Sequence, residues 1–241
     1  MSFVNQHFSQ EISSHVINRR KESFGQIIKI IKQKHPNTLM DIGCASGNFL
    51  FQLTDAYPAI EAVGIDKSAS LIKEALKRQE TRKNPRFFHL DIMSPNSRQQ
   101  RKRLLESNAE LIAILGTLHT FHNFEPILKP LIVNKTTKTI LIHSPFNEDP
   151  VNVRIFHQDL TSANREFQSG YNIFSQQSVS RFLRQNKIYN FQFIPFTMKK
   201  TLKKNLSHPM YNYHLFDKNG KKWATNGARL IFQEYILKIN L

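Results

Sequence analysis

The sequence predicts an α/β fold built on a parallel sheet, and three observations lead to this prediction. Short apolar runs that suit buried strands alternate with segments in which apolar residues recur at helical spacing. Three of these runs close on an aspartate, and a turn with two glycines follows the first of them. Ligands of open α/β sheets bind at the carboxyl ends of strands, so we expect the functional site at that edge.

The composition is that of a large globular domain. The chain has 241 residues, and 19 Phe among 11% aromatic residues argue against disorder. The single cysteine, Cys44, excludes a disulfide framework or a cysteine-rich zinc module, and no set of His, Cys and acidic residues has metal-ligand spacing. No apolar run approaches the ~20 residues of a membrane span. Residues 1–10 lack the apolar core of a secretory signal, so we expect a cytoplasmic protein with no membrane contact.

The first part of the chain contains the expected strands of the sheet. Residues 1–36 are expected to form a helical extension that Pro36 ends, and residues 37–145 to form the core. The helix expected over residues 70–78 has an apolar face of Leu71, Ile72, Ala75 and Leu76. The expected core elements are strands at 38–42, 60–65, 86–90, 111–115 and 139–143 and helices at 48–53, 70–78 and 124–131.

The second part is less regular. Residues 146–174 have scattered aromatic and polar residues without a clear period, and we interpret them as a cap inserted after the fifth strand. A helix over 175–186 is expected with Ser175 as its N-cap. Asn219-Gly220 suits a type I′ hairpin turn. Because no linker divides the chain, we expect one domain over 1–241. The remaining expected strands are 188–196, the hairpin strands 211–216 and 221–224, and 230–237.

The segment from Asp41 to Gly47 lies where the first strand turns into a helix. It does not follow the dinucleotide pattern G-x-G-x-x-G. It is also not a P-loop, because position 48, where a P-loop that starts at Gly43 has its second glycine, is Asn48, and no lysine follows it. Asp66 follows Gly47 by 19 residues and ends the second strand, where its carboxylate is suited to accept hydrogen bonds from two adjacent ribose hydroxyls. Asp91 ends the third strand.

Three segments resemble motifs of the class I S-adenosylmethionine-dependent methyltransferases. They are 39–47, 63–66 and 89–92, and their order and spacing agree with the family over residues 38–145. The resemblance implies a Rossmann-like three-layer sandwich with a seven-stranded, mostly parallel sheet whose last strand is antiparallel. The strands ending at residues 196 and 238 would be the sixth and seventh. It also implies S-adenosylmethionine as cofactor and S-adenosylhomocysteine as product.

The resemblance assigns roles to individual residues. Asp41 would orient the glycine loop and the cofactor's amino group, and the loop would pass under its methionine part. Asp66 would hold the ribose hydroxyls, Asp91 and the Ile92 backbone would border the adenine, and Gly116 with Thr117 would border the methyl donor. The cofactor-binding residues expected in this way are Asp41, Gly43, Cys44, Ala45, Gly47, Asp66, Asp91, Ile92 and Gly116.

The acceptor side is defined by weaker signals. A hydroxyl acceptor needs a base, and His119 and His122 follow the fourth strand, with His143 a weaker candidate; the alternative for each is a surface or capping role. Segments 146–174 and 197–227 are expected to build the acceptor pocket. Their aromatic and amide residues suit a small-molecule or sugar-like acceptor, and they loosely resemble small-molecule and glycan-associated methyltransferases. The candidate acceptor residues are Phe146, Asn147, Tyr171, Asn172 and Trp223.

The net charge of +16 leaves a second function open. A basic face binds phosphate backbones, so the alternatives are an RNA methyltransferase or a non-catalytic RNA-binding module with a methyltransferase-like fold. A solvated helix face explains the same charges without a ligand. Methylation of a nucleobase amino group is disfavoured, because 115–118 lacks the Asn/Asp-Pro-Pro-aromatic motif. The basic clusters are Lys77, Arg78, Arg82, Lys83 and Arg86; Arg98, Arg101, Lys102 and Arg103; and Lys199, Lys200, Lys203 and Lys204.

Overall fold

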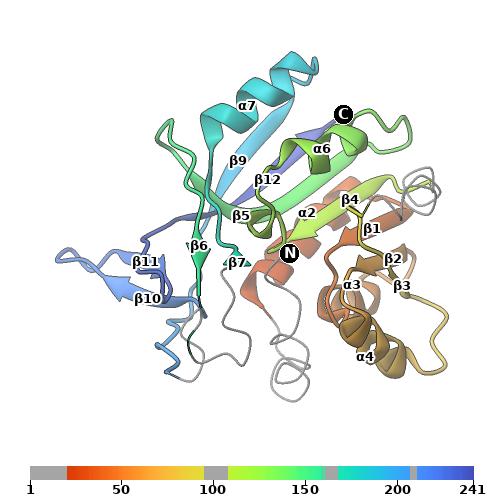
Figure 1. Ribbon diagram of the computed structural model, residues 1–241. Helices are drawn as coiled ribbons and strands as arrows, with labels where there is room; N and C mark the ends of the chain where they lie inside the picture. The colour runs from red at the N-terminus through yellow and green to blue at the C-terminus, as the bar shows by residue number, and fades with distance from the viewer. Residues whose placement is uncertain (1–20, 95–107, 159, 161–167, 207–210) are drawn as a thin grey trace.

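The central sheet has the strand order β3-β2-β1-β4-β5-β12-β9, and β8 adds to the end of β5. This computed structural model describes residues 21–94, 108–158, 160, 168–206 and 211–241 (Figure 1). Strands β1 to β5 pair in parallel, whereas β12 is antiparallel to both β5 and β9. The expected Rossmann-like sheet with an antiparallel last strand is therefore confirmed.

The strands of the core lie close to their expected positions. Strand β4 has the expected bounds, and β12 begins four residues later than the expected strand at 230 and ends beyond it. The inner strands are apolar along most of their length because helices cover both faces of the sheet. The bounds are β1 Thr38–Ile42, β2 Glu61–Asp66, β3 Arg86–His89, β4 Leu111–Leu115, β5 Thr139–Asn147, β9 Phe191–Phe196 and β12 Glu234–Asn240.

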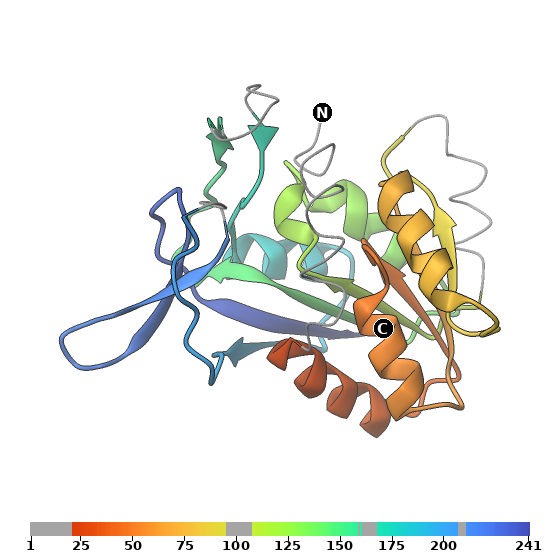
Figure 2. The ribbon, with the colours of Figure 1, turned by 90° about the horizontal axis from the view of Figure 1, so that it is seen from below.

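Two layers of helices cover the sheet. Helices α2 (Glu22–Lys34), α3 (Asn48–Ala56) and α4 (Ala69–Gln79) contribute to one apolar cluster, and α6 (Glu125–Ile132) and α7 (Gln176–Gln185) to the other. Figure 2 shows α2 and α3 below the sheet and α6 and α7 above it. Helix α2 confirms the described part of the helical extension, and residues 1–20 of that extension lie outside the described residues.

Two local expectations about helices have different outcomes. Ser175 caps α7, since its hydroxyl accepts a hydrogen bond from the Ser178 amide at 3.0 Å. Leu76, however, is 48% exposed, whereas Leu71 and Ile72 are buried. Leu76 stands about 140° around the helix axis from Leu71, which places it beyond the buried stripe. Its assignment to the apolar face was wrong.

Two extensions project from the carboxyl edge of the sheet. β6 (Phe156–His157) and β7 (Gln168–Ser169) form an antiparallel arm, and β8 (Phe174–Ser175) pairs with the end of β5. β10 (Tyr213–Phe216) and β11 (Lys222–Thr225) form a hairpin that projects away from the sheet in both ribbon views. Because β5 runs to Asn147, Phe146 and Asn147 belong to the sheet and not to a cap.

The hairpin turn differs from the expected type I′. Asp217 donates its amide to the Lys221 carbonyl at 3.0 Å, which closes a loop of three residues. Gly220 has a φ of +76°, and Asn219 is not among the residues with positive φ. A type I′ turn needs positive φ at both central residues, so the expectation was wrong and the loop is a three-residue one with glycine in the left-handed position.

Candidate functional site

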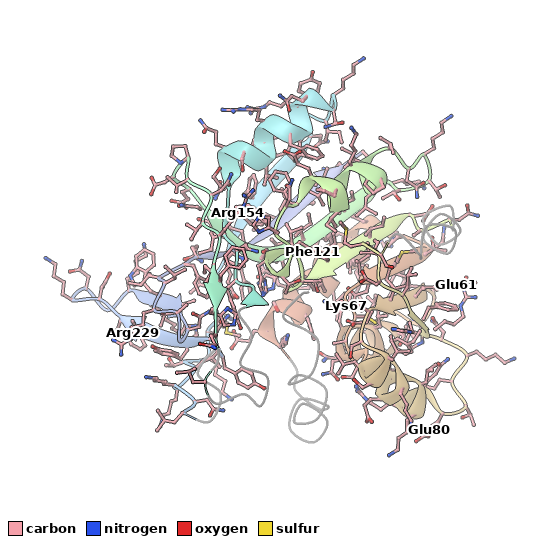
Figure 3. All side chains as sticks on the ribbon, viewed as in Figure 1. Glu61, Lys67, Glu80, Phe121, Arg154 and Arg229 are labelled. Carbon is pink, nitrogen blue, oxygen red and sulfur yellow. The ribbon has the colours of Figure 1, made fainter. Side chains whose placement is uncertain are left out.

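A cavity opens at the carboxyl edge of the sheet, where β1, β2 and β4 end and the arm approaches the short helix η2 (Leu118–Thr120). Lys67, which follows β2, and Phe121, which follows η2, both line this cavity and are labelled near the centre of the molecule in Figure 3. Six of the nine expected cofactor-binding residues lie on its wall: Gly43, Ala45, Asp66, Asp91, Ile92 and Gly116.

The glycine loop is attached to β2 by its backbone. The amides of Gly43 and Cys44 both donate to the Ile65 carbonyl, at 2.8 and 3.1 Å. The Ala45 amide donates to the Asp66 Oδ2 atom at 2.9 Å. These bonds hold the loop over the ends of β1 and β2, with Gly47 at the N-cap of α3.

Asp66 and Asp91 lie at adjacent strand ends. Asp66 is 7% exposed, and its second carboxylate oxygen accepts from the Ser68 amide at 2.8 Å. Burial raises the pKa of Asp66, and its two backbone hydrogen bonds oppose that shift. Asp91 accepts from the Met93 amide at 2.9 Å. Lys67 stands beside both acids, and burial lowers the pKa of Lys67 while the charges of Asp91 and Asp66 oppose the shift.

Three of the expected cofactor-binding residues lie behind the cavity wall. Asp41 is buried, and its Oδ1 atom has no hydrogen-bond partner within the described residues. Burial raises the pKa of Asp41 to about 8, and the charge of Asp66 adds to the shift. The Cys44 side chain is buried, with its sulfur 2.7 Å from where a Gly64 β-carbon would stand. Burial raises the pKa of the Cys44 thiol, which therefore stays protonated. Gly47 begins α3 without lining the cavity.

His119 lines the cavity and stacks on Tyr171, with the ring centroids 5.0 Å apart. Its Nδ1 atom is buried and has no partner among the described residues. Burial lowers the pKa of His119 to about 4, and nearby His143 and Lys21 add to the shift, so this imidazole is neutral at pH 7. His122 is exposed, lies against Phe156 at a centroid distance of 5.7 Å and does not line the cavity.

His143 and Glu234 form a second polar cluster, near His119. The His143 Nε2 atom lies 3.7 Å from a Glu234 carboxylate oxygen, and the other Glu234 oxygen accepts from the Asn212 amide at 3.4 Å. Burial lowers the pKa of His143 to about 3 and raises the pKa of Glu234. Glu234 was not among the residues expected from the sequence, where its only signal is an acid immediately before the buried run of β12.

The candidate acceptor residues have separate positions. Tyr171 lines the cavity with a φ of +58°. Phe146 packs in the core against Phe193 at 5.1 Å. Asn147 donates to the Val151 carbonyl in a turn, and Trp223 donates to Asp217 on the hairpin. Asn172 is fully buried and joins the arm to the segment after β4. Of the five, Tyr171 is thus the one that lines the cavity.

The basic clusters are partly used within the protein. Arg78 donates to the Ser46 carbonyl and to Asn48, both at 2.7 Å, and lies over the Phe51 ring. Arg82 pairs with Asp55 at 3.0 Å. The cluster of Arg98, Arg101, Lys102 and Arg103 lies outside the described residues. The backbone of Lys199 and Lys200 donates to Glu22 at the start of α2, and these lysine side chains face solvent.

No helix in the described parts of the chain is long and apolar enough to cross a membrane. No group of three or more His, Cys, Asp or Glu side chains in those same segments is arranged to hold a metal ion.

Comparisons with known proteins agree with the fold and with the sequence motifs. The chain is 24% identical to malonyl-[acyl-carrier protein] O-methyltransferase of Bacillus cereus over 176 residues, which are 71% of this chain and 60% of that protein. The chain thus spans less than two thirds of that relative's length. The methyltransferase domain of bacterial CtHen1-C has a TM-score of 0.56 at 14% identity, with 91% of this chain and 96% of that chain covered.

Human N-acetylserotonin methyltransferase, solved in complex with S-adenosylmethionine, has a TM-score of 0.54 at 13% identity and covers 91% of this chain and 51% of its own. At these identities the solved structures establish the fold. The family model described as "Methyltransferase domain" matches residues 33–212. The chain therefore belongs to this family of methyltransferase domains, and its resemblance to the class I S-adenosylmethionine-dependent methyltransferases is confirmed.

Proposed function

We propose that the protein binds S-adenosylmethionine in the cavity at the carboxyl edge of the sheet and transfers its methyl group to a hydroxyl of a small polar or sugar-like acceptor. The observation that carries this proposal is the gathering of the glycine loop, Asp66, Asp91 and Gly116 on one cavity wall. These residues come from the ends of four segments that are far apart in the sequence, and family membership predicts that they act together.

The residues present suit each part of the cofactor. The Asp66 carboxylate, which lines the cavity, would accept from ribose hydroxyls, and Asp91 with the Ile92 backbone would border the adenine. Asp41 would hold the ammonium of the methionyl end. A buried carboxylate oxygen without a partner is costly, and a ligand cation would offset that cost. The buried Asp41 Oδ1 atom, which has no hydrogen-bond partner among the described residues, therefore supports the proposal that a cation of the cofactor binds there.

The chain's main tasks in methyl transfer are alignment and exclusion of water. When bound, S-adenosylmethionine would supply a methyl group on a sulfonium for in-line attack by the acceptor oxygen; S-adenosylhomocysteine would be the leaving group, and the hydroxyl proton would pass to water or to the neutral His119 ring. His119 and Tyr171 form the wall beside Gly116 and would position the acceptor. The neutral His119 ring is suited to accept a hydrogen bond from an acceptor hydroxyl, and its low pKa makes it a weak base.

The acceptor class is inferred from the polar residues next to His119. His119 and Tyr171 present hydrogen-bonding groups on the cavity wall, and the cluster of His143, Glu234 and Asn212 lies near His119 without lining the cavity; this polar surrounding suits a hydroxylated small molecule. The name of the Bacillus cereus relative specifies an oxygen acceptor, which supports an oxygen atom as the acceptor here. The exposed lysines at 199–204 favour the alternative of an RNA acceptor, and a substrate screen separates the two.

The first test is calorimetric binding of S-adenosylhomocysteine to the wild type, Asp66→Ala and Asp55→Ala. Asp55 is the matched control, because it pairs with Arg82 on the surface, with 65% of its side chain exposed. We expect micromolar binding that is at least about ten-fold weaker in Asp66→Ala and unchanged in Asp55→Ala. Absence of binding to the wild type would contradict the proposal.

The second test follows the label of methyl-labelled S-adenosylmethionine into candidate acceptors. Pools of hydroxylated small molecules are compared with total RNA under the same conditions. Label in the small-molecule fraction supports the proposed acceptor class. Label in RNA instead would replace that class with the RNA alternative while leaving the cofactor assignment in place.

A further inference from the structure

The segment that follows β9 is fastened to the hairpin of β10 and β11. The Leu202 amide donates to the His214 Nδ1 atom at 2.9 Å, and the His214 amide donates to the Leu202 carbonyl at 3.0 Å. The Lys222 ammonium of β11 donates to two backbone carbonyls of that segment, both at 2.8 Å. Segments 198–206 and 213–225 therefore form one structural element, the hairpin unit, whose two strands project from the sheet in Figure 1 and Figure 2.

The hairpin unit is strongly basic. Its two segments contain seven lysines and a single acid, Asp217. The Asp217 carboxylate is already used within the hairpin, since it accepts from the Asn219 and Lys221 amides at 2.8 and 2.9 Å and from the Trp223 indole at 3.2 Å. Arg229, in the turn after β11, is a further exposed cation beside the hairpin (Figure 3). The exposed lysines of the unit are Lys199, Lys200, Lys203, Lys204, Lys218 and Lys221.

Exposed apolar side chains lie on the same unit. Leu215 and Phe216 end β10 next to the turn and are 44% and 56% exposed, and Leu206 is 80% exposed. Successive strand residues point to opposite faces, so Leu215 and Phe216 place one apolar side chain on each face of the hairpin near its tip. An apolar tip flanked by ammonium groups suits a surface that is anionic outside and apolar inside.

The aromatic rings distinguish between two anionic partners. Single-stranded nucleic acid binds to open ring faces on which its bases stack. The Lys221 ammonium, however, lies 3.9 Å from the centre of the Trp223 ring, and the Lys204 ammonium lies 5.9 Å from the centre of the Tyr213 ring. A lysine thus occupies one face of each ring. The side chains that stay open, Leu215 and Phe216 beside lysines, suit acyl chains beneath phosphate head groups better than stacked bases.

We propose that the hairpin unit docks the protein on an anionic phospholipid surface, with its exposed lysines on the phosphates and with Leu215 and Phe216 at the boundary between head groups and acyl chains. This contact departs from the expectation of a protein without membrane contact, which rested on the lack of a spanning run and of a secretory signal. The inference goes beyond the proposed function and does not depend on it, because none of these side chains lines the cavity.

The test is sedimentation of the whole chain with vesicles of phosphatidylcholine, either alone or with about one third of phosphatidylglycerol. The wild type should bind the anionic vesicles at least about ten-fold more tightly than the neutral ones, and added salt should weaken that binding. Lys199→Gln combined with Lys203→Gln should weaken it roughly ten-fold. Lys32→Gln with Lys34→Gln is the matched control, because it removes the same charge from exposed lysines at the end of α2, and its effect should stay below about two-fold.

A second pair of variants tests the apolar part of the contact. Leu215→Ser combined with Phe216→Ser should weaken binding to anionic vesicles about ten-fold. Val133→Ser, at a residue that is 66% exposed at the end of α6, should leave it unchanged. Melting temperatures close to that of the wild type show that the variants are folded.

Several results would overturn the inference. Equal binding of the wild type to both kinds of vesicle, or binding to neither, would do so without any variant. Equal weakening by the two lysine pairs would assign the binding to net charge instead of the hairpin unit. Tighter binding to poly(uridylic acid) than to anionic vesicles, unchanged by Leu215→Ser with Phe216→Ser, would assign the unit to RNA. None of these results bears on cofactor binding, which calorimetry measures separately.

Discussion

Gly43 and Thr117 are so close that a β-carbon on Gly43 would lie 2.2 Å from the Thr117 hydroxyl oxygen. Gly43 also has a φ of +81°, which side chains rarely adopt. The contact joins the loop after β1 to the turn after β4. We expect Gly43→Ala to lower the free energy of unfolding by roughly 3 kcal/mol, since overlap and backbone strain add, and urea unfolding measures this loss.

Gly116→Ala is the control for that substitution. Gly116 has a φ of +71°, but no atom lies within 4 Å of the position its β-carbon would take. Backbone strain alone should cost about 1 kcal/mol. If the two variants lose equal stability, the close approach of Gly43 to Thr117 does not hold.

Asp41 makes the stability of the ligand-free protein depend on pH. Burial raises the pKa of Asp41 from its ordinary value of 3.8 to about 8. Between these values the folded protein holds a proton that the unfolded chain has lost, so this group's effect is to lower stability as the pH rises. Asp41→Asn removes the effect. The melting temperature of Asp41→Asn relative to wild type should therefore be higher at pH 8.5 than at pH 5.

The same residue couples cofactor binding to proton release. A cofactor ammonium next to Asp41 would hold the carboxylate ionised, so binding below pH 8 should release a proton. We expect the affinity for S-adenosylhomocysteine to rise between pH 6 and 8 and the binding heat to depend on the buffer's ionisation heat. Both effects should be absent in Asp41→Asn. Buffer-independent heat in the wild type would contradict an ammonium at Asp41.

Asn172 connects the arm to the segment after β4. Its side chain donates to the Phe121 carbonyl at 2.8 Å and accepts from the Ile155 amide at 3.0 Å, and it is fully buried. Asn172→Ala leaves both backbone groups without these bonds, which should cost roughly 2–4 kcal/mol in chemical unfolding. Asn190→Ala, at an exposed amide pair, should change stability by less than about 0.5 kcal/mol. Similar losses in the two variants would contradict the role of Asn172.

The part of the cavity wall proposed for the cofactor was predictable from the sequence because its residues are tied to strand ends. Asp66 is the last residue of β2, and the pairing of β1 with β2 brings it beside the glycine loop. Parallel strands align their carboxyl ends, so acids that close successive apolar runs meet at one edge. The order and spacing of these residues in the sequence therefore predict that they lie together at one edge of the sheet.

The part of the cavity wall proposed for the acceptor depends on contacts that sequence spacing does not encode. His143 and Glu234 come from strands far apart in the sequence, and tertiary structure alone brings them to 3.7 Å from each other. Aromatic residues were a poor guide, since burial in a core and contact with a ligand favour the same side chains. Phe146 accordingly lies in the core and Trp223 on the hairpin. The arm strands β6 and β7 have two residues each, too few to show a period.

His143 should make the protein sensitive to acid. Burial lowers the pKa of His143 from its ordinary value of 6.5 to about 3. Below pH 6.5 the unfolded chain therefore binds a proton that the folded protein does not, and stability from this group is lost as the pH falls. The buried acids Asp41 and Glu234, whose pKa values burial raises, have the opposite effect on the pH dependence of stability. The stability of a His143 variant is therefore compared with that of the wild type at each pH. His143→Gln keeps a polar side chain that does not titrate.

The free energy of unfolding of His143→Gln, relative to that of the wild type, should therefore rise by about 2 kcal/mol as the pH falls from 7 to 4.5, as measured by urea unfolding. Asn190→Ala changes no titratable group, so its difference from wild type should be the same at both pH values. The His119 imidazole, whose pKa burial lowers to about 4, should show the same trend in His119→Gln over a narrower range. A difference between His143→Gln and wild type that does not change with pH would mean that His143 is hydrated in the folded protein, and the polar cluster with Glu234 would then be open to solvent.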